Sequence, residues 1–195
     1  MSFFRLWLTC YLNPGRAFEA LRDKPAPLWG LYGVLLRGLI VGVVWYLPRA
    51  LMGLRPAMAP ALPFPPVESY YWHLLWYFPV FEVAKWLLLG AVMHLVLRLA
   101  KLPNDYDAIL NVSGIVTIVI DPAIRIWDWI VFAAGWSENT VLMGAAHALI
   151  FWPWGIVLFV IGLRKLLGLP ACVVVPLYLL TSVLFMPLAT TFLRP

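Results

Sequence analysis

Charged residues are scarce in this sequence. Asp, Glu, Lys and Arg make up 12% of the 195 residues, whereas hydrophobic residues make up 64%. Soluble domains carry roughly 25% charged residues, so this chain has too few charges to cover a surface that faces water. The composition excludes an ordinary soluble domain and predicts a protein whose surface faces lipid.

Cysteine is scarce too. Cys10 and Cys172 are the only two, they lie far apart, and neither belongs to a CxxC or Cys/His ligand pattern. We therefore expect no disulfide and no metal site. The first residues carry one Arg and a short apolar stretch but no small-x-small cleavage site, so we expect the amino terminus to be retained.

The sequence lacks the motifs of the common enzyme classes. It has no GxSxG elbow, no P-loop and no Gly-rich dinucleotide turn, and NVSG at residues 111–114 lacks a partner base at a defined spacing. The net charge of +5 comes from basic residues at the ends of apolar runs rather than from a basic stripe. We expect neither an enzyme, nor a cofactor, nor nucleic-acid binding.

Long apolar runs are what the sequence does contain. Because only a helix or a closed barrel satisfies every backbone polar group in hydrocarbon, runs of this length predict membrane spans. The sequence therefore predicts an all-α integral membrane protein whose residues 28–195 form a bundle of about five transmembrane helices. The expected spans are residues 28–47, 80–99, 108–134, 141–163 and 171–193.

Residues 1–27 form an expected lead-in. Asn13 and Pro14 suit a helix N-cap and first helical position, and the next proline predicts the end of that helix after residue 24. The pattern predicts a short amphipathic helix along the cytoplasmic interface, with a solvated lead-in as the alternative. Its lipid-facing residues would be Ala17, Phe18 and Leu21.

Prolines and aromatic residues occupy the region between the first two spans. The six prolines between Pro48 and Pro66 predict an irregular loop. The second helix is expected to begin near Val67 and to kink at Pro79. An aromatic collar precedes that kink, and it predicts an interfacial belt, with an aromatic ligand box as the alternative. The collar is Tyr70, Tyr71, Trp72, Trp76 and Tyr77.

Lys and Arg predict the orientation. With the amino terminus inside, eight lie on the inner side and three on the outer side, Arg49, Arg55 and Arg194. The positive-inside rule then places the amino terminus in the cytoplasm and the carboxyl terminus outside. We expect a cytoplasmic (inner) membrane protein of a bacterium.

Six charged residues fall inside the expected spans. An unpaired charge near a helix centre costs roughly 2.5 to 3.5 kcal/mol on the insertion scale. Three of the six are basic and three acidic, which favours ion pairs over a pore lined by one sign of charge. This candidate intramembrane charge network is Arg37, Glu82, Lys85, Asp121, Arg125 and Asp128.

Depth along the helices predicts the partners. Arg37 and Asp121 both lie at the middle of their spans, so they can pair, with Arg125 as a second partner of Asp121. Lys85 and Asp128 also share a level, which makes a second cross-helix pair possible. Such pairs either fix the register of the helices or belong to a path for a substrate or proton.

Pro122 and the histidines add two weaker signals. A proline after Asp121 removes one helix hydrogen bond and permits a kink of the kind that transporters use, although inert bundles contain kinks too. His94 and His147 lie roughly 15 Å apart in depth, so they cannot ligate one haem, and His73 lies among interfacial aromatics.

Three segments look familiar as a set: LNPGRAFEALRDKPAP, AVMHLVLRLAKLPNDYDAILNVSGIV and WGIVLFVIGLRKLLGLPACVV. In this order they resemble the entry, the second-to-third span and the fourth-to-fifth span of the Yip domain, the Ypt/Rab-interacting membrane protein family. The resemblance implies a five-helix bundle with a cytosolic amino terminus. The chain lacks the Asp-Leu-x-Gly-Pro type motif of eukaryotic members and looks like a stand-alone prokaryotic form, so the resemblance carries over no site residues.

The function expected from these features is not enzymatic. We expect a Yip-like multi-pass protein that organises or shapes the membrane or scaffolds a membrane complex. Its partners would be the lipid bilayer and a protein partner or a second copy of the chain. The alternative is a small transporter or channel subunit that uses the charged residues at mid-membrane.

Overall fold

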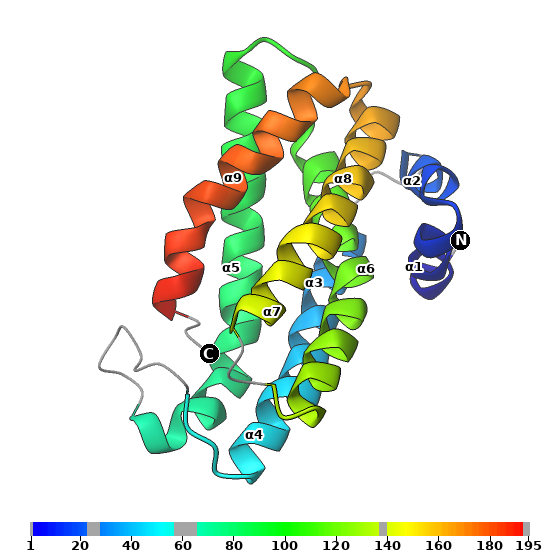
Figure 1. Cartoon of the computed structure of the whole chain (residues 1–195). Coiled ribbons are helices and arrows are strands. Elements are labelled where there is room, and N and C mark those ends of the chain that lie inside the picture. The colour runs from blue at the N-terminus through cyan, green and yellow to red at the C-terminus, as the bar shows by residue number, and fades with distance from the viewer. Residues whose placement is uncertain (1, 23–27, 57–65, 137–139, 193–195) are drawn as a thin grey trace.

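The computed structural model describes residues 2–22, 28–56, 66–136 and 140–192, and every regular element in these ranges is helical. Figure 1 shows the long helices side by side, with the short helices Phe3–Leu12 and Pro14–Arg22 against one flank. The elements are α1 (Phe3–Leu12), α2 (Pro14–Arg22), α3 (Leu28–Val41), η1 (Gly42–Tyr46), α4 (Leu47–Leu51), η2 (Val67–Ser69), α5 (Tyr70–Leu99), α6 (Tyr106–Ala133), α7 (Thr140–Ala146), η3 (His147–Phe151), α8 (Trp152–Leu167) and α9 (Ala171–Phe192).

Within the described ranges, four helices are long and apolar enough to cross a membrane. They are Leu28–Leu51, Val67–Leu99, Tyr106–Ala133 and Gly144–Leu167, and they coincide with the first four expected spans. The fifth expected span falls on α9, of which Ala171–Phe185 forms a shorter apolar helix. Large apolar side chains on the outside of the bundle, such as Leu88, indicate contact with the lipid bilayer.

The first span is longer than the sequence predicted, because the helix does not stop at Pro48. The five residues of η1 form a π-helical turn in which the Leu47 N–H bonds to the Gly42 carbonyl. Pro48 follows in α4, and the Val44 carbonyl, which lacks the N–H that a residue other than proline would offer it, accepts from Trp129 Nε1 at 2.9 Å. The expected loop therefore begins after Leu51, and residues 57–65 lie outside the described part.

The prediction from the prolines placed Arg49 in that loop, and this prediction was wrong. It lies in α4 and is buried, with its Cζ 3.2 Å from the centre of the Trp45 ring. Its Nη1 donates to the Trp45 carbonyl at 3.2 Å. The ring face and the carbonyl compensate a guanidinium that the continued helix removes from water.

Helix α6 lies at the centre of the bundle. It contacts α3, α5 and α8, and a continuous run from Ile109 to Val116 is buried. Gly30 and Gly33 of α3 meet α6 at Gly114, so the two backbones touch with no side chain between them. This close approach brings the charged residues of α3 and α6 within reach of each other.

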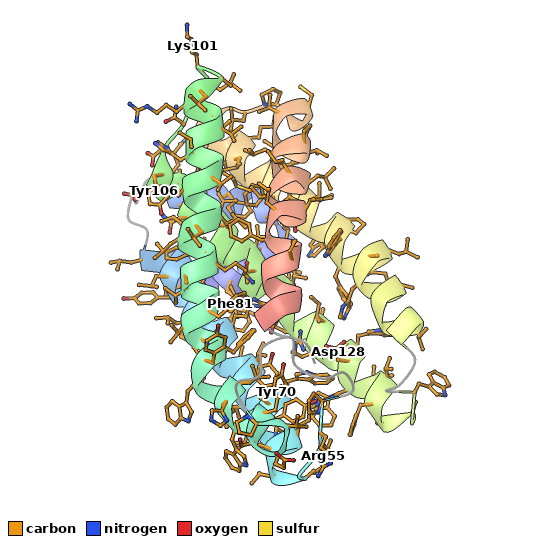
Figure 2. The ribbon with its side chains drawn as sticks, turned by 90° about the vertical axis from the view of Figure 1, so that its left-hand side faces the viewer. Arg55, Tyr70, Phe81, Lys101, Tyr106 and Asp128 are labelled. Atoms are coloured by element: carbon orange, nitrogen blue, oxygen red, sulfur yellow. The ribbon has the colours of Figure 1, made fainter. Side chains whose placement is uncertain are left out.

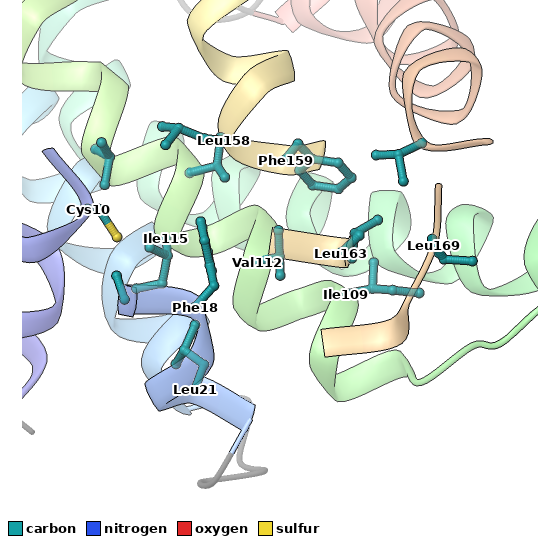
Figure 3. Close-up of a cluster of buried hydrophobic side chains, with 14 of the residues drawn as sticks. Cys10, Phe18, Leu21, Ile109, Val112, Ile115, Leu158, Phe159, Leu163 and Leu169 are labelled. Carbon is teal, nitrogen blue, oxygen red and sulfur yellow. The ribbon is translucent and has the colours of Figure 1, made fainter. Parts of the chain in front are cut away.

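The prediction for the amino-terminal segment was right about one helix and wrong about where its apolar face points. Helix α2 begins at Pro14, and Asn13 Oδ1 accepts from the Arg16 N–H at 3.0 Å, as its N-cap position predicts. Phe18 and Leu21, however, are buried against α6 and α8 instead of facing lipid, as is Ala17. Figure 3 shows Phe18 and Leu21 pointing at side chains of the bundle.

The sequence did not predict helix α1. Two aromatic side chains of this helix donate hydrogen bonds to backbone carbonyls of α6 near Pro122. Pro122 has no N–H for the Ile118 carbonyl, and that carbonyl accepts from Trp7 Nε1 at 3.2 Å. The neighbouring Val119 carbonyl accepts from the Tyr11 hydroxyl at 2.7 Å. The carbonyls near the break are satisfied by the amino-terminal helix, which explains why α1 docks there.

This docking buries Cys10. Its side chain is fully buried, and burial raises the pKa of the thiol to about 12, so almost no thiolate exists at neutral pH. We expect a maleimide at pH 7.5 to label exposed Cys172 but not Cys10. The double change Trp7→Phe and Tyr11→Phe should release α1 and raise labelling of Cys10 at least several-fold. Equal labelling of both cysteines in the unaltered protein would contradict the docked position of α1.

The second helix begins where the sequence predicted, with η2 at Val67 leading into α5, which continues through Pro79. The aromatic collar divides into two groups. Tyr70 and Tyr71 are buried in a cluster with Tyr46, whereas the other three members are exposed. The interfacial belt therefore stays a prediction, and it is restricted to the exposed members, Trp72, Trp76 and Tyr77.

Candidate functional site

The structure joins the six charged residues of the predicted network and one histidine into a single row of contacts. Basic and acidic groups alternate along it. We call this row the charge chain. It runs through Lys85, Glu82, Arg37, Asp121, Arg125, Asp128 and His147, in that order, and connects α5, α3, α6 and η3.

Glu82 is the junction between α3 and α5. Its two oxygens accept hydrogen bonds from different cations, Oε2 from Arg37 Nη1 and Oε1 from Lys85 Nζ. The carboxylate is 2% exposed, so both contacts replace water that it has lost. The sequence identified Glu82 as a member of the network but not as the partner of Arg37.

Asp121 is the junction between α3 and α6. Its Oδ1 accepts from Arg37 Nε at 3.0 Å and lies 3.6 Å from Arg125 Nε. Both contacts are those that depth and helical spacing predicted. Arg37 thus bridges carboxylates on two other helices, which ties three spans together at mid-height.

Asp128 is the junction with η3. Its Oδ2 lies 2.9 Å from Arg125 Nη1, and its Oδ1 lies 2.9 Å from His147 Nε2. Figure 2 places Asp128 in the half of the bundle that lies away from Lys101. The expected pair between Lys85 and Asp128 is replaced, because each of these residues has a partner nearer in the fold.

The sequence could have revealed the role of His147. Both His147 and Asp128 lie five to six residues outward of the middle of their expected spans, so a comparison of depth would have matched them. The π-helical turn that begins at His147 was not predictable, because a proline such as Pro153 can mark either a helix end or a turn of this kind. His147 binds a carboxylate here, and the described residues contain no group of three metal-ligating side chains.

A cavity of about 270 Å³ lies beside the charge chain. Helix α6 contributes Ser113, Thr117 and Asp121, which are spaced four apart and so form a column. Arg37 and Lys85 line the same cavity from α3 and α5. It also reaches Tyr178 and Ser182 of α9 and is otherwise apolar.

Asp121, which lines this cavity, has one oxygen without a hydrogen-bond partner among the described residues. Asp121 Oδ2 is buried and makes no hydrogen bond within the described part of the chain. An unsatisfied carboxylate oxygen in the interior is costly, so it marks a position where water or a ligand can donate. The column and this oxygen can bind a polar molecule, and the neighbouring cations can orient it.

Comparison of the chain with protein-family models, curated proteins and solved structures finds no match.

Proposed function

We propose that this chain is a Yip-like multi-pass membrane protein that organises or shapes the cytoplasmic membrane or scaffolds a complex within it. In this proposal α9 is the fifth span, the amino terminus is cytoplasmic and the carboxyl terminus is outside. The charge chain is the observation that supports it most. Alternating pairs that link four elements fix one register of the helices, as a rigid scaffold requires.

Reconstitution tests the shaping role. Purified protein is added to extruded vesicles at increasing protein-to-lipid ratios, and vesicle diameters are measured by electron cryomicroscopy. A shaping protein is expected to shift the vesicles towards smaller or tubular forms as the ratio rises. If the diameters stay constant and no protein co-purifies from native membranes, both the shaping and the scaffolding roles are refuted.

The orientation yields a separate prediction. A reporter that is active only in the cytoplasm should be active when fused after Lys101 or Leu167 and inactive after Ser137 or Pro195. The physical reason is the excess of Lys and Arg on the inner side, which grows from eight against three to eight against two once Arg49 is assigned to the helix. The opposite activity pattern would invert the orientation.

A second candidate function is a small transporter or channel subunit. The cavity beside Asp121 is the observation that favours it, because a scaffold held only by ion pairs has no need for an unsatisfied carboxylate oxygen. Uptake of labelled solutes into proteoliposomes tests this candidate, and an Asp121→Asn variant should lose any uptake found.

A further inference from the structure

The wall of the cavity formed by α6 is built to accept hydrogen bonds. The Ser113 hydroxyl donates to the Leu110 carbonyl at 3.1 Å, and the Thr117 hydroxyl donates to the Ser113 carbonyl at 2.8 Å. Each hydroxyl has thereby used its only proton, so it offers just lone pairs to anything in the cavity. The carboxylate of Asp121 extends this column with a negatively charged acceptor, and its Oδ2 makes no hydrogen bond within the described residues.

Lys85 and Arg37 offer hydrogen-bond donors to the cavity. An ammonium group has three N–H donors, and Lys85 Nζ donates one of them to Glu82. A guanidinium has five, and Arg37 donates to Glu82 and Asp121. Both side chains line the cavity, so it offers cationic donors as well as the acceptors of α6.

Charge balance restricts what the cavity holds. The charge chain contains three cations and three carboxylates, and it is neutral when His147 is neutral. A ligand with a net charge would leave that charge uncompensated inside an apolar bundle, which is unfavourable. A ligand with one group of each sign avoids this cost and matches both walls.

We propose that the cavity binds a small zwitterion, with its N–H-bearing ammonium group on Asp121 Oδ2 and its anionic group on Lys85. The volume of about 270 Å³ is many times the ~10–15 Å³ that a single water needs, which leaves room for an amino acid or the ethanolamine phosphate group of a phospholipid. This inference rests on the second candidate function and names its ligand class.

A pair of matched ligands tests the proposal with the whole chain in detergent. Glycine carries N–H donors, whereas trimethylglycine has the same net charge and carries none. Saturating glycine is expected to raise the melting temperature by about 2–4 °C or more, because a ligand that binds only the folded state stabilises it. Trimethylglycine, acetate and methylammonium should not. Equal shifts with trimethylglycine would overturn the proposal.

Whether the zwitterion is the headgroup of a phospholipid is also tested by melting temperature. Nanodiscs of phosphatidylethanolamine are compared with nanodiscs of phosphatidylcholine, whose headgroup lacks N–H donors. A higher melting temperature in phosphatidylethanolamine, with no effect of glycine, identifies a lipid headgroup as the ligand. The absence of a shift in both the free-ligand and the lipid comparison refutes the site.

Single substitutions test whether the shift in melting temperature arises from binding in the cavity. Thr117→Val keeps the size of the side chain but removes an acceptor, and it should reduce the shift at least several-fold, as should Asp121→Asn. If Asp121→Asn fails to fold, Thr117→Val alone decides. Glu19→Gln, at an exposed pair with Lys165 away from the cavity, should keep the full shift. Binding of glycine without uptake into proteoliposomes would refute transport while leaving the site in place.

Discussion

Replacing either Arg37 or Asp121 by leucine is expected to destabilise the protein more than replacing both. Arg37→Leu leaves Asp121 with only the 3.6 Å contact to Arg125, and Asp121→Leu leaves one side of Arg37 unpaired in the interior. Breaking a buried pair from one side typically costs 3–5 kcal/mol, whereas an apolar contact of similar size in place of the pair is often neutral. The double variant should therefore recover most of either single loss.

Thermal unfolding in detergent measures this. For a chain of this length each kcal/mol corresponds to about 2–4 °C, so each single change should lower the melting temperature by about 6–20 °C. The double variant still leaves Glu82 paired with Lys85, and Arg125 with Asp128. If the two single losses simply add, Arg37 and Asp121 are not coupled.

The exposed pair of Glu19 and Lys165 provides the matched control. Nζ of Lys165 lies 2.5 Å from Glu19, and both side chains are more than 40% exposed. Water solvates either partner when the other is removed, so single and double changes there should leave the melting temperature nearly unchanged. Equal stability of all charge-chain variants together with loss of solute uptake would assign the charges to a transport path.

Gly114→Val is expected to separate α3 from α6 and to break the charge chain with it. Even one Cβ at Gly114 would lie 2.5 Å from Gly30 Cα, and that neighbour is backbone, which cannot rotate away. Overpacking alone costs about 1–3 kcal/mol. Displacing α3 also removes Arg37 from Asp121, so the total loss should exceed ~4 kcal/mol.

The measurement is again the melting temperature, with Gly144→Ala as the control. A Cβ at Gly144 meets nothing within 4 Å, and this helical position should tolerate alanine or gain from it. Gly114→Ala should already lower the melting temperature by several degrees. If Gly114→Val melts like the unaltered protein, the two backbones do not touch in solution.

The four long helices were predictable because each has its own signal. A run of about twenty apolar residues can satisfy its backbone in lipid only as a helix, whatever its neighbours are. The end of the first span was missed for a local reason, since a π-helical turn at Gly42–Tyr46 lets the helix pass through Pro48. Proline alone does not distinguish a stop from such a turn.

The contact between Arg37 and Asp121 was also predictable, because both lie at the middle of parallel spans and an unpaired charge there is costly. The contact between Glu82 and Arg37 was not predictable, because the depth of a residue along its helix does not tell which faces of α3 and α5 meet. The docking of α1 could not be predicted either. Its ten residues are too few for a span, and its partners are carbonyls of Ile118 and Val119, far along the chain.

The sequence by itself determined the helices, their apolar character and the set of charges that need partners, because these depend on the composition and spacing of neighbouring residues. Only the tertiary structure decided which charges meet, where the amino-terminal helices pack and that a cavity stays open beside Asp121. Rotation of each helix about its axis and the close approach at Gly114 set these contacts. Both come from packing between segments distant in the chain, where local patterns carry no information.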